Sequence, residues 1–418
     1  MQPPRLKNDC FALPPGINWT PVDDALALLK ERLSCVVGQE QVLVADAVGR
    51  VLAQDVTALR SNPPTANSAV DGYGFAFASL SDGVQTLPLV DGRAAAGQAF
   101  DGDVPAGQAI RILTGARIPA GVDTVILEED TTLEGDWIAF HSGLKAGANT
   151  RNAGEDVTAG SAVLKAGRRL QPQDLALLTA VGLAEVSVRK ALRVGVLSTG
   201  DEIKPAGAVI GDAEIYDANR PMLLAVLGRW QFEAVDLGHV RDDRDVLRAC
   251  LNDAATKVDA ILTSGGASAG DEDHLSALLK AEGGIHSWRI AVKPGRPLAL
   301  GQWQGVPVFG LPGNPVAAFV CALVFAQPAL GVLGGADWQA PQGFMVAASF
   351  AKNKKPGRRE YLRARLDNDG RAEVFQSEGS GRISGLSWAD GLVELEDAGR
   401  EISPGDLVKY YPYGAFGL

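Results

Sequence analysis

Between residues 191 and 334, apolar strand-like runs alternate with helix-like segments, and this alternation constrains the fold more than any other feature. In chain order the predicted elements are strand 192–198, helix 220–230, strand 234–240, helix 244–256, strand 259–263 and helix 274–281, followed by strands near Ile290 and Val308 and a helix from Pro315. Strands that alternate with helices predict a parallel, doubly wound sheet. We therefore expect an α/β domain over residues 191–335.

The segments on either side have a different texture. Short β-like runs (108–113, 123–127 and 137–140) alternate with Gly, Asp and Pro turns, which predicts a β-rich inserted domain over residues 60–149. Amphipathic helices at 21–33 and 172–181 indicate a discontinuous first domain. Its two parts are 21–59 and 150–190, and short strands return over 336–418. With 418 residues, the chain is expected to be multidomain, of α/β plus β-rich class.

Composition excludes several classes of partner. The net charge of −11, with both signs interspersed, argues against nucleic-acid binding, which needs a basic face. Four cysteines without Cys-x-x-Cys spacing favour a reducing compartment. The N-terminal twenty residues have no apolar signal-peptide core, and the longest apolar run, 316–326, is too short to span a bilayer. We therefore expect a soluble, cytoplasmic protein without membrane or nucleic-acid partners.

Acidic residues follow three of the predicted strands. The three segments are Ser-Thr-Gly-Asp-Glu at 198–202, Arg-Asp-Asp at 241–243, and Ser-Gly-Gly-Ala-Ser-Ala-Gly-Asp-Glu-Asp at 264–273. An acid after one strand is more often a helix cap. Acids after three strands that should end on the same sheet edge indicate a hard-cation site, of the kind that Mg²⁺ occupies beside substrate phosphates.

Glycines and cations on neighbouring turns indicate anion binding. Gly265 and Gly266 permit close backbone approach, and successive N–H groups there can cradle a phosphate, although a flexible turn is the alternative. The turn 293–297, Lys-Pro-Gly-Arg-Pro, carries two cations and is stiffened by two prolines, although a solvated basic turn is the alternative. The turn 311–315 opens a helix with Asn314 as N-cap, and a helix N-terminus favours anions whether or not it binds one.

Polar turns also occur in the β-rich segment. Asp71 stands in an Asp-Gly turn, and Thr114 follows a strand in a similar turn. Asp-Gly is an ordinary turn dipeptide, so the residues alone favour a structural role for Asp71.

Ten stretches in order resemble the molybdopterin molybdenumtransferase family, whose relatives include the E domain of the scaffold protein gephyrin. They are 64–73, 111–129, 149–156, 197–202, 215–220, 241–243, 264–273, 293–297, 311–315 and 379–381. Each motif is weak alone, but ten in order over nearly the whole chain after the first twenty residues are highly specific. The resemblance implies four domains, the fourth a C-terminal β-barrel. It also implies a homodimer whose active site lies between the third domain of one subunit and the second domain of the other.

The resemblance also assigns residues to roles. The catalytic set it implies is Asp71, Thr114, Glu202, Asp242, Lys293 and Arg296. The implied substrate-binding set is Gly265, Gly266, Ser268, Asp273, Pro312, Pro315, Arg363 and Ser380. The implied metal ligands are Glu202, Asp242, Asp243 and Asp273, where either Asp242 or Asp243 supplies the acid of its turn. The chain departs from the family at Val70, often Met, and at Arg296, often Lys, which keeps the charge but changes its shape.

The function implied by the resemblance is insertion of molybdate into adenylated molybdopterin with release of AMP, assisted by Mg²⁺. Mg²⁺ at the acids would neutralise the phosphoanhydride, and molybdate would lie among Arg, Lys and backbone N–H groups. The adenylyltransferase that supplies the substrate and the apoenzymes that receive the cofactor are further expected partners. Two alternatives are a molybdopterin adenylyltransferase, which would consume ATP, and a non-catalytic gephyrin-like scaffold.

Overall fold

The computed structural model describes residues 19–265, 274–288, 290–295 and 298–418, with the backbone alone for 285–288. The chain divides into two compact units, Gln41–Val188 and Met1–Glu40 with Arg189–Leu418. Each unit has its own hydrophobic clusters, so each is described by itself.

A six-stranded sheet forms the centre of the α/β domain. Its strand order is β16 (Glu233–Val240), β13 (Arg193–Thr199), β17 (Ala260–Ser264), β21 (Val306–Leu311), β20 (Leu298–Trp303) and β18 (Gly284–Trp288). The first four strands are parallel, whereas β20 and β18 pair in antiparallel fashion. The prediction of a wholly parallel sheet is therefore wrong at this edge. The reason is a two-residue turn, Gln304-Gly305, whose φ angles of 49° and 84° make a tight hairpin.

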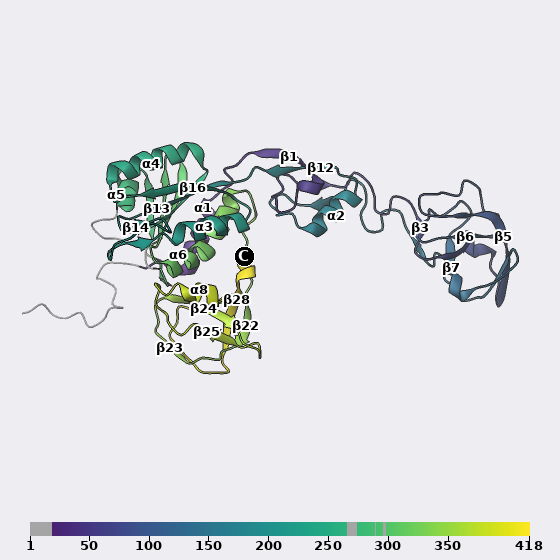
Figure 1. Cartoon of the computed structure of the whole chain (residues 1–418). Coiled ribbons are helices and arrows are strands. Elements are labelled where there is room, and N and C mark those ends of the chain that lie inside the picture. Colours follow the sequence, from purple (N-terminus) through teal and green to yellow (C-terminus); the bar gives the residue numbers. More distant parts are fainter. Residues whose placement is uncertain (1–18, 266–273, 289, 296–297) are drawn as a thin grey trace, which may run out of the picture. The chain divides into compact units, whose positions relative to one another are not determined.

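Helices cover both faces of this sheet (Figure 1). On one face, α4 (Arg244–Lys257) and α5 (His274–Ala281) bury Leu247, Leu251 and Leu278 against Leu197 and Ile261. On the other face lie α1 (Val22–Arg32), α3 (Asn219–Arg229) and the helix that begins with α6 (Pro315–Cys321). Successive strand residues point to opposite faces, so neighbouring apolar residues of one strand supply both cores. The helix predicted over 21–33 corresponds to α1, and its buried side chains belong to the core on this second face of the sheet.

The helix from Pro315 is longer than its apolar run suggests. It continues from α6 through a π-helical turn, η4 (Ala322–Ala326), into α7 (Gln327–Leu333), giving 19 residues with a mean hydropathy of 2.2. The apolar run 316–326 was too short to cross a membrane, but the whole helix is long and apolar enough to do so by length and composition alone. It is 83% buried inside the protein, and burial in the domain core accounts for its apolar composition.

The C-terminal domain is built on a curled sheet with its own core. The path is β19 (Val292–Lys293), β24 (Arg359–Leu366), β26 (Gly391–Leu395), β28 (Leu407–Pro412) and β22 (Phe344–Ala347), with β25 (Ala372–Val374) on β24. A two-stranded sheet of β23 (Lys352–Lys354) and β27 (Arg400–Ile402) and a short helix, α8 (Ser384–Trp388), complete it. The strand expected near Ile290 belongs to this sheet as β19, and its register sets Lys293 beside Glu360. The predicted β-barrel stays a prediction.

The unit Gln41–Val188 contains a six-stranded sheet with the order β7 (Thr124–Leu127), β4 (Gly72–Phe75), β6 (Ala109–Ile112), β5 (Val84–Ala94), β9 (Trp137–His141) and β8 (Thr132–Glu134). Its core includes Tyr73, Phe75 and Ile138. A separate cluster around Leu52 and Leu178 joins α2 (Pro172–Ala180) to the pairs β1 (Gln39–Leu43) with β12 (Glu185–Arg189) and β2 (Val56–Thr57) with β11 (Ala162–Leu164). The pair β3 (Asn67–Ser68) and β10 (Thr150–Arg151) also belongs to this unit.

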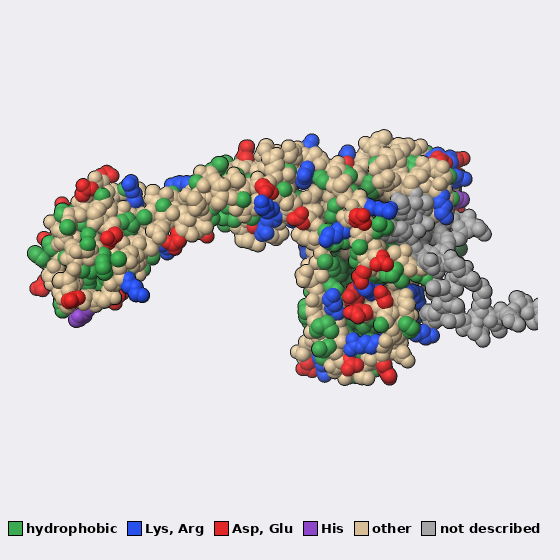
Figure 2. Space-filling model, turned by 180° about the vertical axis from the view of Figure 1, so that it is seen from behind, with side chains coloured by type: hydrophobic (Ala, Val, Ile, Leu, Met, Phe, Trp, Pro, Cys, Tyr) green, Lys and Arg blue, Asp and Glu red, His purple; other side chains and the backbone are tan. Residues whose placement is uncertain are grey.

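On the face of the protein shown in Figure 2, acidic and basic side chains are interspersed.

Candidate active site

A cavity of about 670 Å³ opens at the carboxyl ends of β13, β17 and β21. Loops following parallel strands converge on one edge of a sheet, which is where ligands bind in open α/β sheets. The C-terminal domain supplies part of the lining through Arg358, Glu378 and Ser380. The small sheet of β14 (Ile203–Lys204) and β15 (Ile215–Tyr216) supplies Ile215 and Tyr216.

The floor of this cavity carries buried polar atoms without protein partners. Ser198, Thr199 and Asn219 are only 2%, 6% and 7% exposed. Their Oγ, Oγ1 and Oδ1 atoms have no hydrogen-bond partner among the described residues. A buried polar atom left unpaired costs about 1–3 kcal/mol, so three at one place indicate a site that a polar ligand or water completes.

Asn219 is held in one orientation by its own amide. Its Nδ2 donates to Ser264 Oγ and to the Gly313 carbonyl, both at 2.7 Å. These bonds join the start of α3 to the loops after β17 and β21 and leave Oδ1 as the unpartnered atom. Asn219 was not among the predicted site residues, although it lies in the motif 215–220. An Asn before a helix is typical of capping, so local sequence did not single it out.

The turn after β17 requires glycine at its first position. Gly265 has φ of 93°, and an added Cβ would lie 2.7 Å from the Thr199 carbonyl oxygen. The end of β13 and the turn after β17 therefore approach each other closely, and the predicted contact of this turn with a phosphate stays a prediction. Gly266, Ser268 and Asp273, the other predicted residues of this segment, lie outside the described residues.

The predicted acids occupy different environments. Glu202 lines the cavity. Asp242 lies beside the loop after β13, because the Asp201 N–H donates to Asp242 Oδ2 at 3.4 Å and the Asp242 N–H donates to Asp201 Oδ1 at 3.2 Å. Asp243 caps α4, and its Oδ1 accepts from the N–H groups of Asp245 and Val246 at 2.9 and 3.0 Å.

The capping bonds of Asp243 lower the pKa of its carboxyl group. The capping alternative therefore applies to this acid, and Asp242 is the better metal-ligand candidate of the two. Within the described residues, no group of three or more His, Cys, Asp and Glu side chains is arranged to hold a metal ion.

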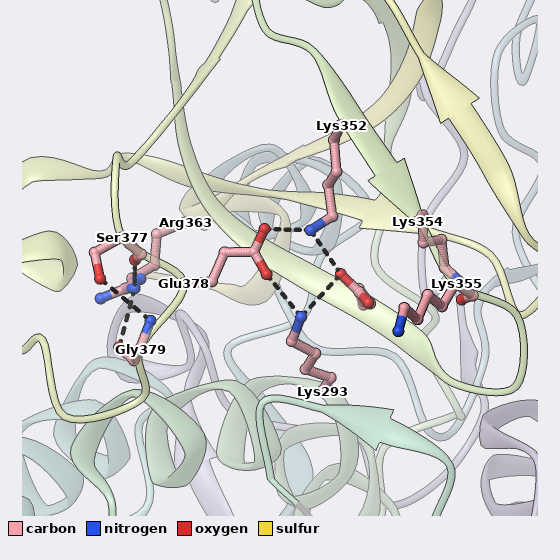
Figure 3. Close-up of polar contacts among 9 residues, drawn as sticks. Lys293, Lys352, Lys354, Lys355, Arg363, Ser377, Glu378 and Gly379 are labelled. Carbon is pink, nitrogen blue, oxygen red and sulfur yellow. Dashed lines mark hydrogen bonds and ion pairs between the residues drawn. The ribbon is translucent and has the colours of Figure 1, made fainter. Parts of the chain in front are cut away.

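Lys293 stands where the cavity meets the C-terminal domain. Its Nζ lies 2.6 Å from Glu378 Oε2 and 3.4 Å from Glu360 Oε2, so two carboxylates neutralise it (Figure 3). A second lysine, Lys352, pairs with the same two acids. Arg296, the other predicted cation of this turn, lies outside the described residues. No local pattern marked Lys352 or Glu378, because the four side chains come from four separate segments, β19, β23, β24 and the loop after β25.

Arg363 is 4% exposed and organises the loop that carries Ser380. Its guanidinium donates to the carbonyls of Ser377, Gly379 and Arg382 and lies 4.9 Å above the Phe375 ring. It also lines a smaller cavity of about 160 Å³. The guanidinium thus holds this loop through three hydrogen bonds, and its positive charge stands beside the smaller cavity.

The start of α6 faces the larger cavity through Pro312, Asn314 and Pro315. Asn314 occupies the N-cap position, but its side chain makes no capping hydrogen bond. The Ser380 carbonyl accepts from the Val316 N–H at 3.4 Å, which brings the C-terminal loop to this helix start. Pro312, Pro315 and Ser380 of the predicted binding set thus line one cavity.

In the other unit, Asp71 and Thr114 are in direct contact. The Thr114 N–H and Oγ1–H both donate to Asp71 Oδ1 at 2.6 Å. These bonds, first that of the side chain and then that of the backbone, lower the pKa of Asp71. Arg111 of β6 pairs through both terminal nitrogens, at 2.8 and 2.7 Å, with Glu128 of the short helical turn Glu128–Asp130. The structure therefore brings the two predicted residues of this domain together.

Three family models match the chain in order. They are "MoeA N-terminal region (domain I and II)" over residues 20–182, "Probable molybdopterin binding domain" over 195–331, and "MoeA C-terminal region (domain IV)" over 346–413. The three matches fall, in order, on the N-terminal part of the chain with the β-rich sheet, on the α/β domain and on the C-terminal domain.

Relatives match over nearly the full length. The chain is 36% identical to the molybdopterin molybdenumtransferase of Haemophilus influenzae over 94% of this chain and 98% of that protein. It is 27% identical to the gephyrin of Dictyostelium discoideum over 94% of this chain and 62% of that protein. Among solved structures, the molybdopterin biosynthesis moeA protein of Pyrococcus horikoshii OT3 matches with a TM-score of 0.81 and 28% identity, over 95% of this chain and all of that one.

Proposed function

The chain belongs to the molybdopterin molybdenumtransferase family, and on that premise we propose that it inserts molybdate into adenylated molybdopterin and releases AMP. The observation that carries this proposal is the cavity of about 670 Å³, which is lined by residues with unpartnered buried polar atoms at the carboxyl end of β13 and at the start of α3. Its size suits a nucleotide-bearing ligand, since ligand pockets commonly enclose about 300–1,000 Å³.

The polar floor would bind the phosphate-bearing part of the substrate. Ser198 and Thr199 can donate hydroxyl protons to phosphate oxygens, and Asn219 Oδ1 can accept from a hydroxyl or amine of the ligand. Glycine at position 265 lets the turn after β17 pack against the Thr199 backbone, which brings two lining segments of the cavity together. Preorganised donors of this kind contribute to phosphoryl chemistry by orienting the reacting groups and stabilising charge.

The acids at this edge fit Mg²⁺. Glu202 lines the cavity and Asp242 is tied to the same loop through Asp201, so the chain offers one or two carboxylates beside substrate phosphates, which is the usual donor set for this ion. When bound, Mg²⁺ neutralises charge that develops on the phosphoanhydride. Glu202 and Asp242 would hold it, with Asp273 as a further ligand.

Molybdate would bind where the larger cavity meets the smaller cavity of about 160 Å³. Lys293 lines both cavities, Ser380 lines the larger one and Arg363 lines the smaller one, and we assign these three residues and Arg296 to the oxyanion. Tetrahedral oxyanions favour charge-assisted donors and helix N-termini, and α6 begins beside Ser380. The metal and the oxyanion would then bind at different places, each beside groups of the opposite charge.

We propose that Asp71 and Thr114 complete the site of a second subunit in a homodimer. Their direct hydrogen bond fixes the Asp71 carboxylate on a turn of the β-rich domain, where it can serve as a preformed acceptor. The expected compartment is the cytoplasm, supported by the free thiols of Cys35, Cys250 and Cys321. The adenylyltransferase that makes the substrate and cofactor-receiving apoenzymes remain the proposed protein partners.

The experiment that tests the function is AMP release by the purified chain from adenylated molybdopterin, molybdate and Mg²⁺, without ATP. We expect one AMP to be released for each adenylated molybdopterin consumed, and only when molybdate is present. An adenylyltransferase would instead consume ATP, and a scaffold would release no AMP. Either result would overturn the proposal. The matches to the N-terminal and C-terminal regions, which flank the molybdopterin-binding domain, favour the transferase.

A further inference from the structure

Four charged side chains form a cluster at the junction of the two cavities. They are Lys293, Lys352, Glu360 and Glu378. Lys293, Pro294 and Glu378 line both the cavity of about 670 Å³ and the smaller one of about 160 Å³. Lys352 and Arg363 line the smaller cavity, which is therefore a basic pocket that Glu378 and Lys293 separate from the larger one.

Glu378 holds a different lysine with each carboxylate oxygen (Figure 3). Its Oε2 accepts from Lys293 Nζ at 2.6 Å, and its Oε1 accepts from Lys352 Nζ. Burial alone would raise the pKa of Glu378, but the hydrogen bonds from Lys293 and Lys352 outweigh it and lower the pKa. Glu378 is therefore an anion that forms ion pairs with the two lysines of the small pocket.

The four side chains differ in exposure. Glu378 is 45% exposed, whereas Lys352 and Glu360 are 11% and 8% exposed. Glu378 is carried by a loop, and the carbonyls of its two neighbours, Ser377 and Gly379, are held by the buried Arg363. The Glu378 side chain can thus turn towards solvent by rotation about its own bonds while the loop backbone stays in place. The buried pair of Lys352 and Glu360 lacks that freedom.

The charges of the pocket match a dianion only when Glu378 is displaced. The pocket is lined by Lys293, Lys352 and Arg363, and the two lysines pair with Glu378 and Glu360, so these five groups together carry a net charge of +1. When Glu378 turns away, the three cations and Glu360 that remain carry +2. A tetrahedral oxyanion with two negative charges neutralises that pocket and supplies acceptors for the lysines that Glu378 released.

We propose that Glu378 is a displaceable internal counter-ion that holds Lys293 and Lys352 until an incoming oxyanion dianion takes its place, so that Glu378 sets the affinity of the small pocket for the oxyanion. The proposal rests on the proposed function, because it is that function which makes molybdate the relevant oxyanion. Glu378 thus acts on the affinity for the oxyanion and takes no part in bond breaking.

The test is isothermal titration calorimetry of the full chain with molybdate alone, near neutral pH and at fixed low salt. Glu378→Gln keeps the size of the side chain and removes the competing charge. The matched control is Glu373→Gln, in which an acid of similar exposure in the same domain loses its pairing with Arg365. We expect Glu378→Gln to bind molybdate about threefold or more tightly than the wild-type chain, on the scale of one partly exposed ion pair, and Glu373→Gln to bind as the wild type does.

Three outcomes would overturn the proposal. They are unchanged or weaker binding by Glu378→Gln, equal tightening in both variants, and no molybdate binding by any of the three proteins. Far-ultraviolet circular dichroism and the thermal midpoint check that each variant is folded, and Glu378→Ser provides a second uncharged side chain. The assay contains no pterin, so its failure is distinguishable from failure of the proposed function, which AMP release decides.

Discussion

Replacement of Asn219 by alanine separates the structural role of the cavity floor from its binding role. The change removes two buried hydrogen bonds of 2.7 Å, to Ser264 Oγ and to the Gly313 carbonyl. At about 0.5–1.5 kcal/mol for each bond, the free energy of unfolding should fall by roughly 1–3 kcal/mol. Loss of Oδ1 should cost no stability, because this atom has no partner in the folded protein.

The binding role of Asn219 should appear as a loss of kcat/KM that the loss of stability does not explain. If Oδ1 contacts the substrate, Asn219→Ala should lower kcat/KM for adenylated molybdopterin by about tenfold, as loss of a hydrogen bond in a desolvated site does. Native-state hydrogen exchange of the β13 and α3 amides measures stability within the α/β domain, and initial rates of AMP release measure kcat/KM.

The matched control is Asn252→Ala. Asn252 Oδ1 also accepts two hydrogen bonds, from Trp303 Nε1 at 2.9 Å and Gln304 Nε2 at 2.8 Å, but this side chain lies on α4, away from the cavity lining. It should lose a similar amount of stability and keep its kcat/KM. Equal kcat/KM in the two variants, at conditions where both are folded, would refute a binding role for Asn219.

Three further predictions concern the metal site, the loss of stability at low pH and an active site shared between two subunits. Glu202→Gln should leave thermal stability unchanged and slow Mg²⁺-dependent AMP release by on the order of tenfold or more, and normal turnover would remove Glu202 from the metal site. The pKa of Asp174 is lowered because hydrogen bonds from Arg168 and the Gln171 N–H outweigh burial, which alone would raise it. Its stabilisation is therefore present above its unfolded pKa near 3.8 and is lost as pH falls through the lower folded value. Asp174→Asn should make the thermal midpoint fall less between pH 6 and pH 3 than in the wild type, and parallel curves would contradict this. A hybrid dimer of Asp71→Asn with Glu202→Gln, purified through two tags, should show about half the wild-type activity while each parent is nearly inactive, because both lesions fall in one site. An inactive, folded hybrid would place the site within one subunit.

Periodicity predicted the helices and the four parallel strands of the α/β domain, because their apolar faces repeat at regular spacing, but it missed β18 and β20. It did not predict the antiparallel edge, since Gln304 is an unusual residue at a left-handed turn position and Gln-Gly is a weak hairpin signal. It also did not predict that β19 leaves the α/β sheet for the C-terminal one, because this choice depends on pairing with Arg359 and Glu360, distant in sequence.

Motifs within one segment predicted residues that the structure brings together. Glu202, Gly265, Pro312 and Ser380 all line one cavity, while their roles there stay predictions. The cluster around Glu378 was not predicted, because an ion pair between distant segments leaves no pattern in either segment. Asp243, predicted as an alternative to Asp242 at the metal site, caps α4 in the structure.

A crystal structure of the full chain with adenylated molybdopterin tests the central claim most directly. The phosphate groups should lie in the larger cavity, with oxygens or other polar ligand atoms within hydrogen-bond distance of Ser198 Oγ, Thr199 Oγ1 or Asn219 Oδ1, the buried atoms that lack protein partners. Ligand density elsewhere, with these three atoms still unpartnered, would contradict the assignment of this cavity as the active site.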